Sequence, residues 1–374
     1  MKEIIKRVDL TKQWKKEKRY LLPLIENVLS SGEYVNSKLI PLLEKKIAKF
    51  CGTKYTVCTN SGTDALTLGL YVLGIKRGDE VITVPNSFIA SAASIAHLGA
   101  KPVFVDVNDE QLIDPTKIEK SITKKTKAIM VVHLSGRVAD MKPIKKIAKK
   151  YKLFIIEDAA QSVGSKYFGK MTGSLGDIGC FSAHPLKNLN ACGDSGFITT
   201  NNFLHYKKLK SLINHGLENR NMSAQYGYVS RLDSIQAVIL NYRLKLLTKK
   251  IKRRRSLANL YLKKLKNLPI KLPNEKTGEY NSFHLFVIQT EYRDRLKNFL
   301  KKNNVETGIH YPIPIHLQKA SKHLKYEVGN FKNTETQSKQ ILSLPIHENL
   351  TDNQINLISN LIKKFFDDKK KSKS

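Results

Sequence analysis

The stretch KLFIIEDAAQSVGS, residues 152–165, begins as an almost continuous apolar run and ends in polar residues. Short apolar runs of this kind are typical of strands that are buried on both faces of a parallel sheet. Similar runs precede it: EVITVP (80–85), KPVFVDV (101–107) and KAIMVVHL (127–134). Segments with helical spacing lie between the runs: DALTLGLYVLG (64–74), FIASAASIAHLG (88–99) and MKPIKKIAKKYK (141–152). This alternation predicts an open α/β sheet.

The chain after Asp233 has a different pattern. A long basic segment with helical periodicity comes first, and residues 271–290 then indicate a loop that enters a strand. The remaining residues alternate between helical and strand patterns on a smaller scale. We therefore predict a large domain in residues 1–250, including an N-terminal arm, and a small C-terminal α+β domain in residues 251–374.

The composition is strongly basic, with 65 Lys and Arg against 32 Asp and Glu, a formal charge of +33. Such a charge is compatible with nucleic-acid binding, but also with lysines spread over solvated helix faces. In residues 141–152 the lysines surround an apolar stripe, as on an amphipathic helix. The chain has no zinc-finger, RNP-type or basic-zipper pattern. The distribution favours a surface bias, and we expect no nucleic-acid partner.

The sequence also indicates where the protein works. Its hydrophobic content of 41% is that of a globular protein and excludes a disordered polycation. No run reaches the roughly 18 apolar residues of a membrane span, and the charged start lacks the apolar centre of a signal peptide. The four cysteines show no CxxC pairing or metal-ligand spacing. We expect a cytoplasmic protein without a metal site or a membrane span.

Three loops that we expect at strand ends carry polar residues of complementary kinds. In TNSGTDALTLGL, residues 59–70, Gly62 and Thr63 open a helix whose free N–H groups suit a phosphate. The same pattern also fits an ordinary helix N-cap. At the end of the 152–165 run, Asp158 follows Glu157, and Gln161 comes one turn later. A carboxylate here can hold a protonated ring nitrogen, or can simply cap a helix or turn.

The third polar loop is GDIGCFSAHPLKNLNACGDSG, residues 176–196, which contains Lys187. Residues 157–200 hold only three lysines and no arginine against four acidic residues, so Lys187 is not part of a general basic face. The chain has no GxGxxG after a strand and no Walker loop, which argues against a Rossmann dinucleotide-binding site and against a P-loop nucleotide site. A lysine, a carboxylate and a phosphate cradle together suit pyridoxal phosphate. Phe88 is available to stack on its ring, or to pack in the core.

Six segments in chain order carry a family resemblance: NSGTDAL (60–66), DEVITVPNSFIA (79–90), EDAAQSVGS (157–165), FSAHPLKN (181–188), SRLDSIQA (230–237) and TGIHYPIPIHLQ (307–318). Together they resemble the DegT/DnrJ/EryC1/StrS family of pyridoxal-phosphate-dependent sugar aminotransferases over nearly the whole chain. The resemblance implies the fold-type I, aspartate-aminotransferase-like architecture: a large domain with a mainly parallel seven-stranded sheet and a small C-terminal α+β domain. It also implies a homodimer with active sites at the subunit interface.

The resemblance implies a role for each motif residue. Lys187 is similar to the Schiff-base lysine, Asp158 to the partner of the pyridinium nitrogen, and Gln161 to the residue that contacts the cofactor's 3-hydroxyl. The other positions are the phosphate contacts and stacking aromatic Gly62, Thr63, Ser182 and Phe88, and the sugar-nucleotide contacts His310 and Tyr311. The implied reaction moves an amino group from a donor, expected to be glutamate, to a nucleotide-linked ketosugar in amino-sugar and cell-surface polysaccharide biosynthesis.

Some positions depart from the family pattern. Val229 stands where the family usually has the asparagine that contacts the partner subunit's cofactor phosphate, and valine has no hydrogen bond to donate. Ala183 replaces the usual aromatic before His184. The segment NLNACGDSG (188–196) is more similar to 3-ketosugar enzymes than to 4-ketosugar enzymes, which slightly favours a 3-keto-6-deoxyhexose. Two alternatives stay open: a non-catalytic regulator with this fold, and a sugar dehydratase, in which histidine replaces the lysine.

Overall fold

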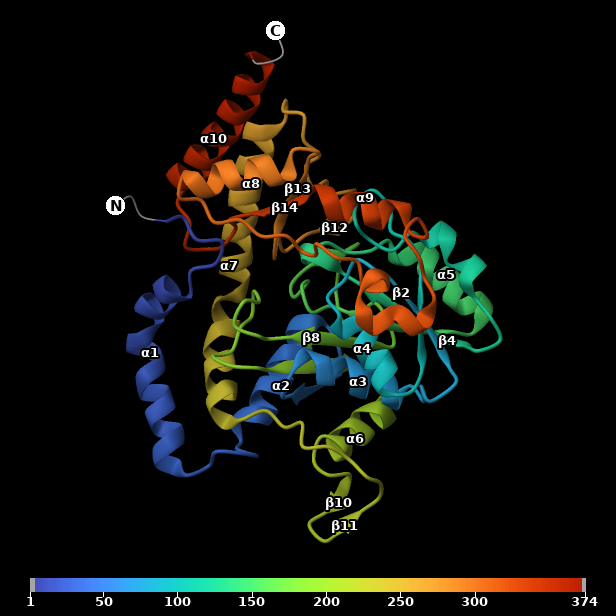
Figure 1. The fold of residues 1–374 in the computed structure, drawn as a ribbon. Helices are drawn as coiled ribbons and strands as arrows, with labels where there is room; N and C mark the ends of the chain where they lie inside the picture. Colours follow the sequence, from blue (N-terminus) through green and yellow to red (C-terminus); the bar gives the residue numbers. More distant parts are fainter. Residues whose placement is uncertain (1–3, 372–374) are drawn as a thin grey trace.

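The computed structural model describes residues 4–371, and its larger part is built on a seven-stranded sheet (Figure 1). The strands are β1 (Tyr55–Thr59), β2 (Glu80–Thr83), β3 (Lys101–Phe104), β4 (Thr126–Val132), β5 (Phe154–Asp158), β8 (Ile178–Ser182) and β9 (Gly196–Thr200). Their order is β1-β9-β8-β5-β4-β2-β3. Neighbouring strands from β8 to β3 are parallel, and β9 is antiparallel to both neighbours. The predicted fold class, with a mainly parallel sheet, is confirmed.

Helices cover both faces of this sheet. They are α2 (Leu39–Cys51), α3 (Gly62–Val72), α4 (Ala90–His97), α5 (Met141–Tyr151) and α6 (Phe203–Leu212). Successive side chains of a strand point to opposite faces, so Val81 packs in the cluster of α3 while Ile82 packs in the cluster of α5. Both faces are therefore apolar, which is why these strands appear in the sequence as continuous hydrophobic runs.

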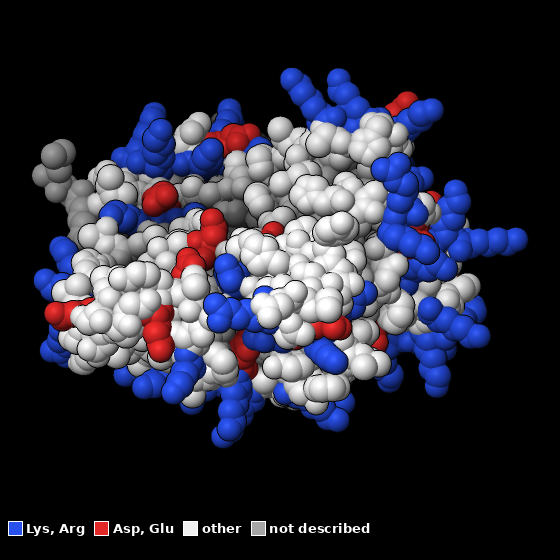
Figure 2. All heavy atoms as spheres, turned by 90° about the horizontal axis from the view of Figure 1, so that it is seen from below, with Lys and Arg blue, Asp and Glu red and all other residues white. Residues whose placement is uncertain are grey.

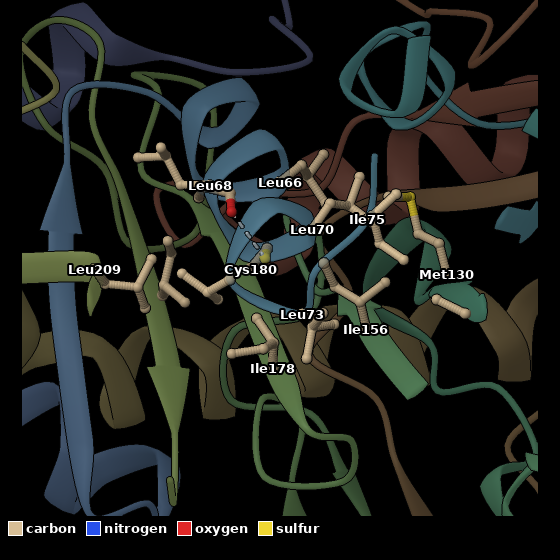
Figure 3. Close-up of a cluster of buried hydrophobic side chains, with 14 of the residues drawn as sticks. Leu66, Leu68, Leu70, Leu73, Ile75, Met130, Ile156, Ile178, Cys180 and Leu209 are labelled. Carbon is tan, nitrogen blue, oxygen red and sulfur yellow. Dashed lines mark hydrogen bonds between the residues drawn. The ribbon is translucent and has the colours of Figure 1, made fainter. Parts of the chain in front are cut away.

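Helix α3 is fixed to the sheet by a cluster of fully buried aliphatic side chains (Figure 3). Leu70 from the helix and Ile156 and Ile178 from the strands are 0% exposed. The Cys180 thiol, on β8, donates a 3.1 Å hydrogen bond to the Ala65 carbonyl of α3. This packing holds the N-terminus of α3 at the edge of the sheet where the parallel strands end.

The C-terminal part is a smaller α+β unit with its own apolar cluster. Its elements are β13 (Phe286–Gln289), β14 (Ile341–Leu344), α8 (Arg293–Lys302) and α10 (Asp352–Lys371). Helix α7 (Ser234–Leu265) joins the two parts: Leu247 packs with the large part and Tyr261 with the small one. We propose that the domain boundary lies near residue 250, within α7, and that the small domain begins there.

The remaining elements lie around these two parts. The helices are α1 (Leu10–Ser31) and α9 (Lys332–Gln340). The short strands are β6 (Lys166–Tyr167), β7 (Lys170–Met171), β10 (Leu217–Asn219), β11 (Met222–Ser223) and β12 (Glu279–Tyr280). Short 3₁₀ turns cover Pro115–Lys117, Glu119–Ser121, Leu134–Gly136, Ile315–Leu317 and Lys319–Leu324. Helix α1 lies along α7, where Glu17 forms buried ion pairs with Arg243 (2.8 Å) and Lys250 (3.0 Å). The β10–β11 hairpin extends away from the sheet (Figure 1).

The basic side chains are distributed over the surface. On the face shown in Figure 2, Lys and Arg lie mainly around the periphery and are separated by acidic and uncharged residues. This matches helices such as α5, whose Met141, Ile144 and Ala148 are buried while most of its lysines are exposed. Within residues 4–371, no helix combines the length and the apolar character that crossing a membrane requires.

Candidate active site

A cavity of about 360 Å³ lies where the parallel strands end, a size typical of small-molecule sites. Loops after β1, β2, β4, β5 and β8 form its walls, and residues of the C-terminal part and of the N-terminal arm complete it. All nine site residues predicted from the sequence line this one cavity: Gly62, Thr63, Phe88, Asp158, Gln161, Ser182, Lys187, His310 and Tyr311. Their roles toward a ligand stay predictions.

One wall of the cavity is the N-terminus of α3. Ser61 caps this helix by accepting a 3.0 Å hydrogen bond from the Asp64 N–H. The N–H groups of the first helical residues, Gly62 and Thr63, have no partner within the helix and are available to an anion. Gly62 packs so tightly on β8 that an added Cβ would lie 2.6 Å from the Ser182 Cβ. Glycine is therefore required here for the close approach of the two loops.

Substitution of Gly62 by alanine is expected to weaken binding of the phosphate-bearing cofactor by about 10- to 100-fold. The added methyl group must push Ser182 and the start of α3 apart, an overpacking cost of roughly 1–3 kcal/mol. The measurement is a spectroscopic titration of cofactor-free protein with pyridoxal phosphate. Gly193→Ala is the matched control, because its Cβ would meet only the movable end of the Gln236 side chain, at 3.3 Å. Equal cofactor affinities of the two variants would contradict the requirement for glycine at position 62 of the phosphate site.

The two acidic residues that end β5 have different environments. Glu157 points away from the cavity and is fully buried. Its carboxylate accepts hydrogen bonds from the N–H groups of Gly173 (2.8 Å), Leu175 (2.7 Å) and Gly176 (2.7 Å), and lies 3.0 Å from His133 Nε2. These bonds satisfy the carboxylate within the protein. Glu157 therefore organises the loop before β8, whereas Asp158 lines the cavity.

Asp158 faces the cavity, and its carboxylate is oriented from two sides. One oxygen, Oδ2, accepts a 2.6 Å hydrogen bond from the Ser91 hydroxyl, and Oδ1 accepts one of 3.2 Å from the Ala160 N–H. The Ser87 and Ser91 hydroxyls are 2.6 Å apart, which extends the chain of hydrogen bonds. An oriented and buried carboxylate suits a positively charged ring nitrogen. Sequence analysis did not identify Ser87 or Ser91, because buried serines at the start of a helix carry no distinctive pattern.

Lys187 projects into the same cavity from the loop after β8. Burial lowers the pKa of this amine to about 8, although the negative charge of Asp158 opposes the shift. The loop is held by the Lys187 N–H, which donates to the His184 carbonyl (2.9 Å), and by Asn190, which donates to the Pro185 carbonyl (2.8 Å). An amine with a lowered pKa has a larger neutral fraction near pH 7, as a nucleophile or a general base requires.

Gln161 joins the cavity wall to the C-terminal part. Its Oε1 accepts a 2.8 Å hydrogen bond from the Ser135 N–H, and its Nε2 donates a 3.2 Å bond to the Tyr311 hydroxyl. The Phe88 ring lies 5.6 Å from the Tyr311 ring and is 54% exposed, which leaves one side of it open. Burial raises the pKa of Tyr311 to about 12, so this phenol stays protonated and can donate.

His310 is neutral in this environment. Burial, together with the charges of Arg7 and Lys187, lowers its pKa to about 4. Its Nδ1 lies 2.9 Å from the Ser343 hydroxyl on β14, which fixes the ring. Arg7 itself lines the cavity and was not identified from the sequence, because no local motif in the N-terminal arm shows that it reaches a site so distant in the chain.

These residues fit pyridoxal phosphate. The cavity joins a lysine of lowered pKa, an oriented carboxylate, and a helix N-terminus that a glycine keeps open. Fold and site together define a fold-type I enzyme that depends on pyridoxal phosphate. The chain belongs to the DegT/DnrJ/EryC1/StrS aminotransferase family, whose model matches residues 15–363.

Three related proteins are similar to this chain over most of its length. A protein of Aneurinibacillus thermoaerophilus named dTDP-3-amino-3,6-dideoxy-alpha-D-galactopyranose transaminase is 40% identical over 91% of this chain and 94% of its own. The 3-oxo-glucose-6-phosphate:glutamate aminotransferase of Bacillus subtilis is 36% identical over 88% and 76%. A pleiotropic regulatory protein of Geobacillus stearothermophilus is 38% identical over 96% and 98%.

Solved structures show the same fold. DesV of S. venezuelae, in complex with a ketimine intermediate, superposes with a TM-score of 0.95 at 35% identity and covers 97% of this chain and 98% of its own. NtdA of Bacillus subtilis, with its bound cofactor PMP, gives a TM-score of 0.86 at 33% identity over 93% and 82%. The chain is a pyridoxal-phosphate-dependent aminotransferase.

Proposed function

We propose that this enzyme transfers an amino group from glutamate to a nucleotide-linked ketosugar, with a 3-keto sugar slightly favoured over a 4-keto sugar. The product would serve amino-sugar and cell-surface polysaccharide biosynthesis. The observation that carries the proposal is the presence of Lys187 and Asp158 in one cavity, with the amine at a pKa of about 8.

The chain's own residues then have distinct tasks. Bound pyridoxal phosphate supplies an electron sink for the carbanion that forms at the donor's α-carbon. The Lys187 Nζ takes the proton from that carbon and later returns a proton, as general base and acid. The Asp158 carboxylate holds the positive charge at the ring nitrogen, and Ser91 keeps this carboxylate in place. We assign the phosphate to Gly62, Thr63 and Ser182, and the 3-hydroxyl to Gln161.

The names of relatives support the substrate class. The protein of Aneurinibacillus thermoaerophilus is named for a 3-amino sugar on dTDP, which supports a nucleotide-linked sugar. That of Bacillus subtilis is named for a 3-oxo sugar phosphate and glutamate, which supports the 3-keto position and the donor. The segment NLNACGDSG, residues 188–196, points to the same carbon. We assign His310 and Tyr311, which enter the cavity from the C-terminal part, to contacts with the sugar nucleotide.

We further propose a homodimer with active sites at the subunit interface. The β10–β11 hairpin projects from the large part (Figure 1). Exposed apolar and aromatic side chains lie on this hairpin (Met222) and just after it (Tyr226 and Tyr228), and a partner subunit would cover them. Val229, 56% exposed beside this hairpin, has no side-chain hydrogen bond to offer a partner's phosphate, so another residue would have to replace that contact.

Paired 3-keto and 4-keto sugars on the same nucleotide, each incubated with glutamate, test the proposed reaction. We expect a larger kcat/KM for the 3-keto sugar and a product that carries an amino group at that carbon, identified by mass and NMR. Reactions without glutamate are the control and should yield no amine. A product that loses a hydroxyl without gaining an amine would instead support the dehydratase alternative. Preference for the 4-keto sugar would contradict the assignment of the carbon.

The sequence also left open a non-catalytic regulator with this fold, and one relative is named a pleiotropic regulatory protein. Membership of an aminotransferase family argues against that role for this chain. The presence of both Lys187 and Asp158 in the cavity favours an enzyme. The visible spectrum of the purified protein separates the two candidates. A cofactor band that shifts when glutamate is added supports catalysis, whereas protein that binds no cofactor supports the regulator.

A further inference from the structure

The N-terminal arm, residues 4–9 before helix α1, places the cationic side chain of Arg7 in the cavity. Ile5 forms a bridge with Val305, and its N–H donates to the Asn304 carbonyl at 2.8 Å. Two residues later, the Arg7 N–H donates to the Glu306 carboxylate at 3.1 Å. The arm is therefore attached to the C-terminal part on both sides of Lys6, and this attachment directs the Arg7 side chain into the cavity.

The Arg7 side chain passes over Gly308. A Cβ added to this glycine would lie 3.1 Å from the Arg7 Cδ, 3.2 Å from its Nε and 2.9 Å from the His310 Cε1. Arg7 and His310 thus lie side by side above a residue that leaves room for both. The charge of Arg7 reaches the same region as the charge of Lys187, since both lower the pKa of His310 and of His284.

The Arg7 guanidinium has no carboxylate partner in the part of the chain that the structure describes; only its backbone N–H bonds to Glu306. Two carboxylates line the cavity, those of Asp158 and Asp194. Asp158 is already held by Ser91 and Ala160, and neither carboxylate forms an ion pair with Arg7. The cavity therefore contains a half-buried arginine whose five N–H donors are free to bind an anionic ligand.

We propose that Arg7 binds a carboxylate group of the amino-acid donor, and this assignment rests on the donor named in the proposed function. A guanidinium pairs with a planar carboxylate through two parallel hydrogen bonds. Lys187 acts at the donor's α-carbon, to which one carboxylate is directly attached, so that carboxylate must lie close to Lys187. The diphosphate of a sugar nucleotide is separated from its reacting carbon by sugar atoms, which makes it the less suitable partner. Arg7 is thus a specificity-determining residue supplied by the arm.

The test follows each half of the reaction separately in the holoenzyme, through the change in cofactor absorbance. For Arg7→Gln we expect the half-saturating glutamate concentration to rise about 10- to 100-fold, as loss of a charge-assisted hydrogen bond implies. The reaction of the aminated cofactor form with the ketosugar should keep its wild-type kinetics. Arg7→Lys should recover part of the glutamate affinity. The matched control is Lys6→Gln, which removes an exposed charge of the same arm outside the cavity.

A direct binding measurement accompanies the kinetics. Calorimetric titration of the holoenzyme with glutarate, an unreactive dicarboxylate, should show weaker binding to Arg7→Gln than to the wild type or to Lys6→Gln. Equal glutarate affinity and equal glutamate kinetics in all three proteins would overturn the proposal. An effect on the ketosugar half-reaction alone would overturn it too, since Arg7 would then serve an acidic group of the acceptor. If wild-type enzyme does not react with glutamate, the proposed donor fails, and the glutarate titration still decides whether Arg7 binds carboxylates.

Discussion

Replacement of Lys187 by alanine is expected to lower the rate of amino transfer by up to about 10,000-fold and to remove the cofactor's visible absorbance band. Lys187 is the only lysine that lines the cavity within residues 4–371, so no neighbouring amine there can take over its proton transfer. Burial already lowers its pKa to about 8, which raises the fraction of this amine that is neutral near pH 7. The measurements are turnover with glutamate and a ketosugar, and the visible spectrum of the purified variant.

Lys170→Ala is the matched control for this experiment. Lys170 lies on β7, is exposed, and does not line the cavity. Its replacement should leave both the spectrum and turnover unchanged. Thermal unfolding of both variants shows whether the fold is retained, and we expect it to be, because the Lys187 loop is held mainly by backbone and Asn190 contacts. A Lys187→Ala protein that kept both its absorbance band and its turnover would refute the assignment.

The position of Asp158 was predictable because a parallel sheet places the carboxyl ends of its strands along one edge. Lys187 was found in the polar loop of residues 176–196, which was also expected at a strand end. Each apolar run in the sequence marks a strand that is buried on both faces, and the polar residue after each run therefore lies at this edge. The family resemblance then indicated which polar residue had which role. The fold class follows from the same pattern, and the structure confirms it.

The sequence could not separate Glu157 from Asp158 by residue type alone. Adjacent residues of a strand point to opposite faces, so one of the two had to turn away from the ligand, but the direction depends on the surrounding loops. The structure shows three backbone N–H groups on Glu157 and the Ser91 hydroxyl on Asp158. Arg7 was missed for a related reason. Its approach to the cavity depends on contacts of the arm with the C-terminal part, such as the hydrogen bond to Glu306, 299 positions later. The local sequence pattern does not predict a contact between such distant residues.

Substitution of Asp158 by asparagine is expected to lower the rate of amino transfer by about 100- to 1,000-fold, as the loss of a preorganised electrostatic contact does in other sites. Asparagine keeps the size of the side chain and can still accept from Ser91, but it has no charge to hold a protonated ring nitrogen. Removal of the negative charge also favours the neutral form of Lys187, so the pKa of that amine should fall further below about 8. The measurements are kcat and the pH dependence of the cofactor spectrum.

Two further variants make this prediction specific. Asp177→Asn places the same change at the other end of β5, where the carboxylate accepts a 2.7 Å bond from the Ile155 N–H outside the cavity, and should leave kcat unchanged. Ser91→Ala removes the 2.6 Å bond that orients Asp158 but keeps the charge, so its effect should be smaller, about 10-fold. We therefore expect Asp177→Asn to be the most active of the three variants, Ser91→Ala to be less active, and Asp158→Asn to be the least active. If Asp158→Asn were as active as Asp177→Asn, the charge at the end of β5 would have no role in catalysis, and the orientation of Asp158 by Ser91 would be purely structural.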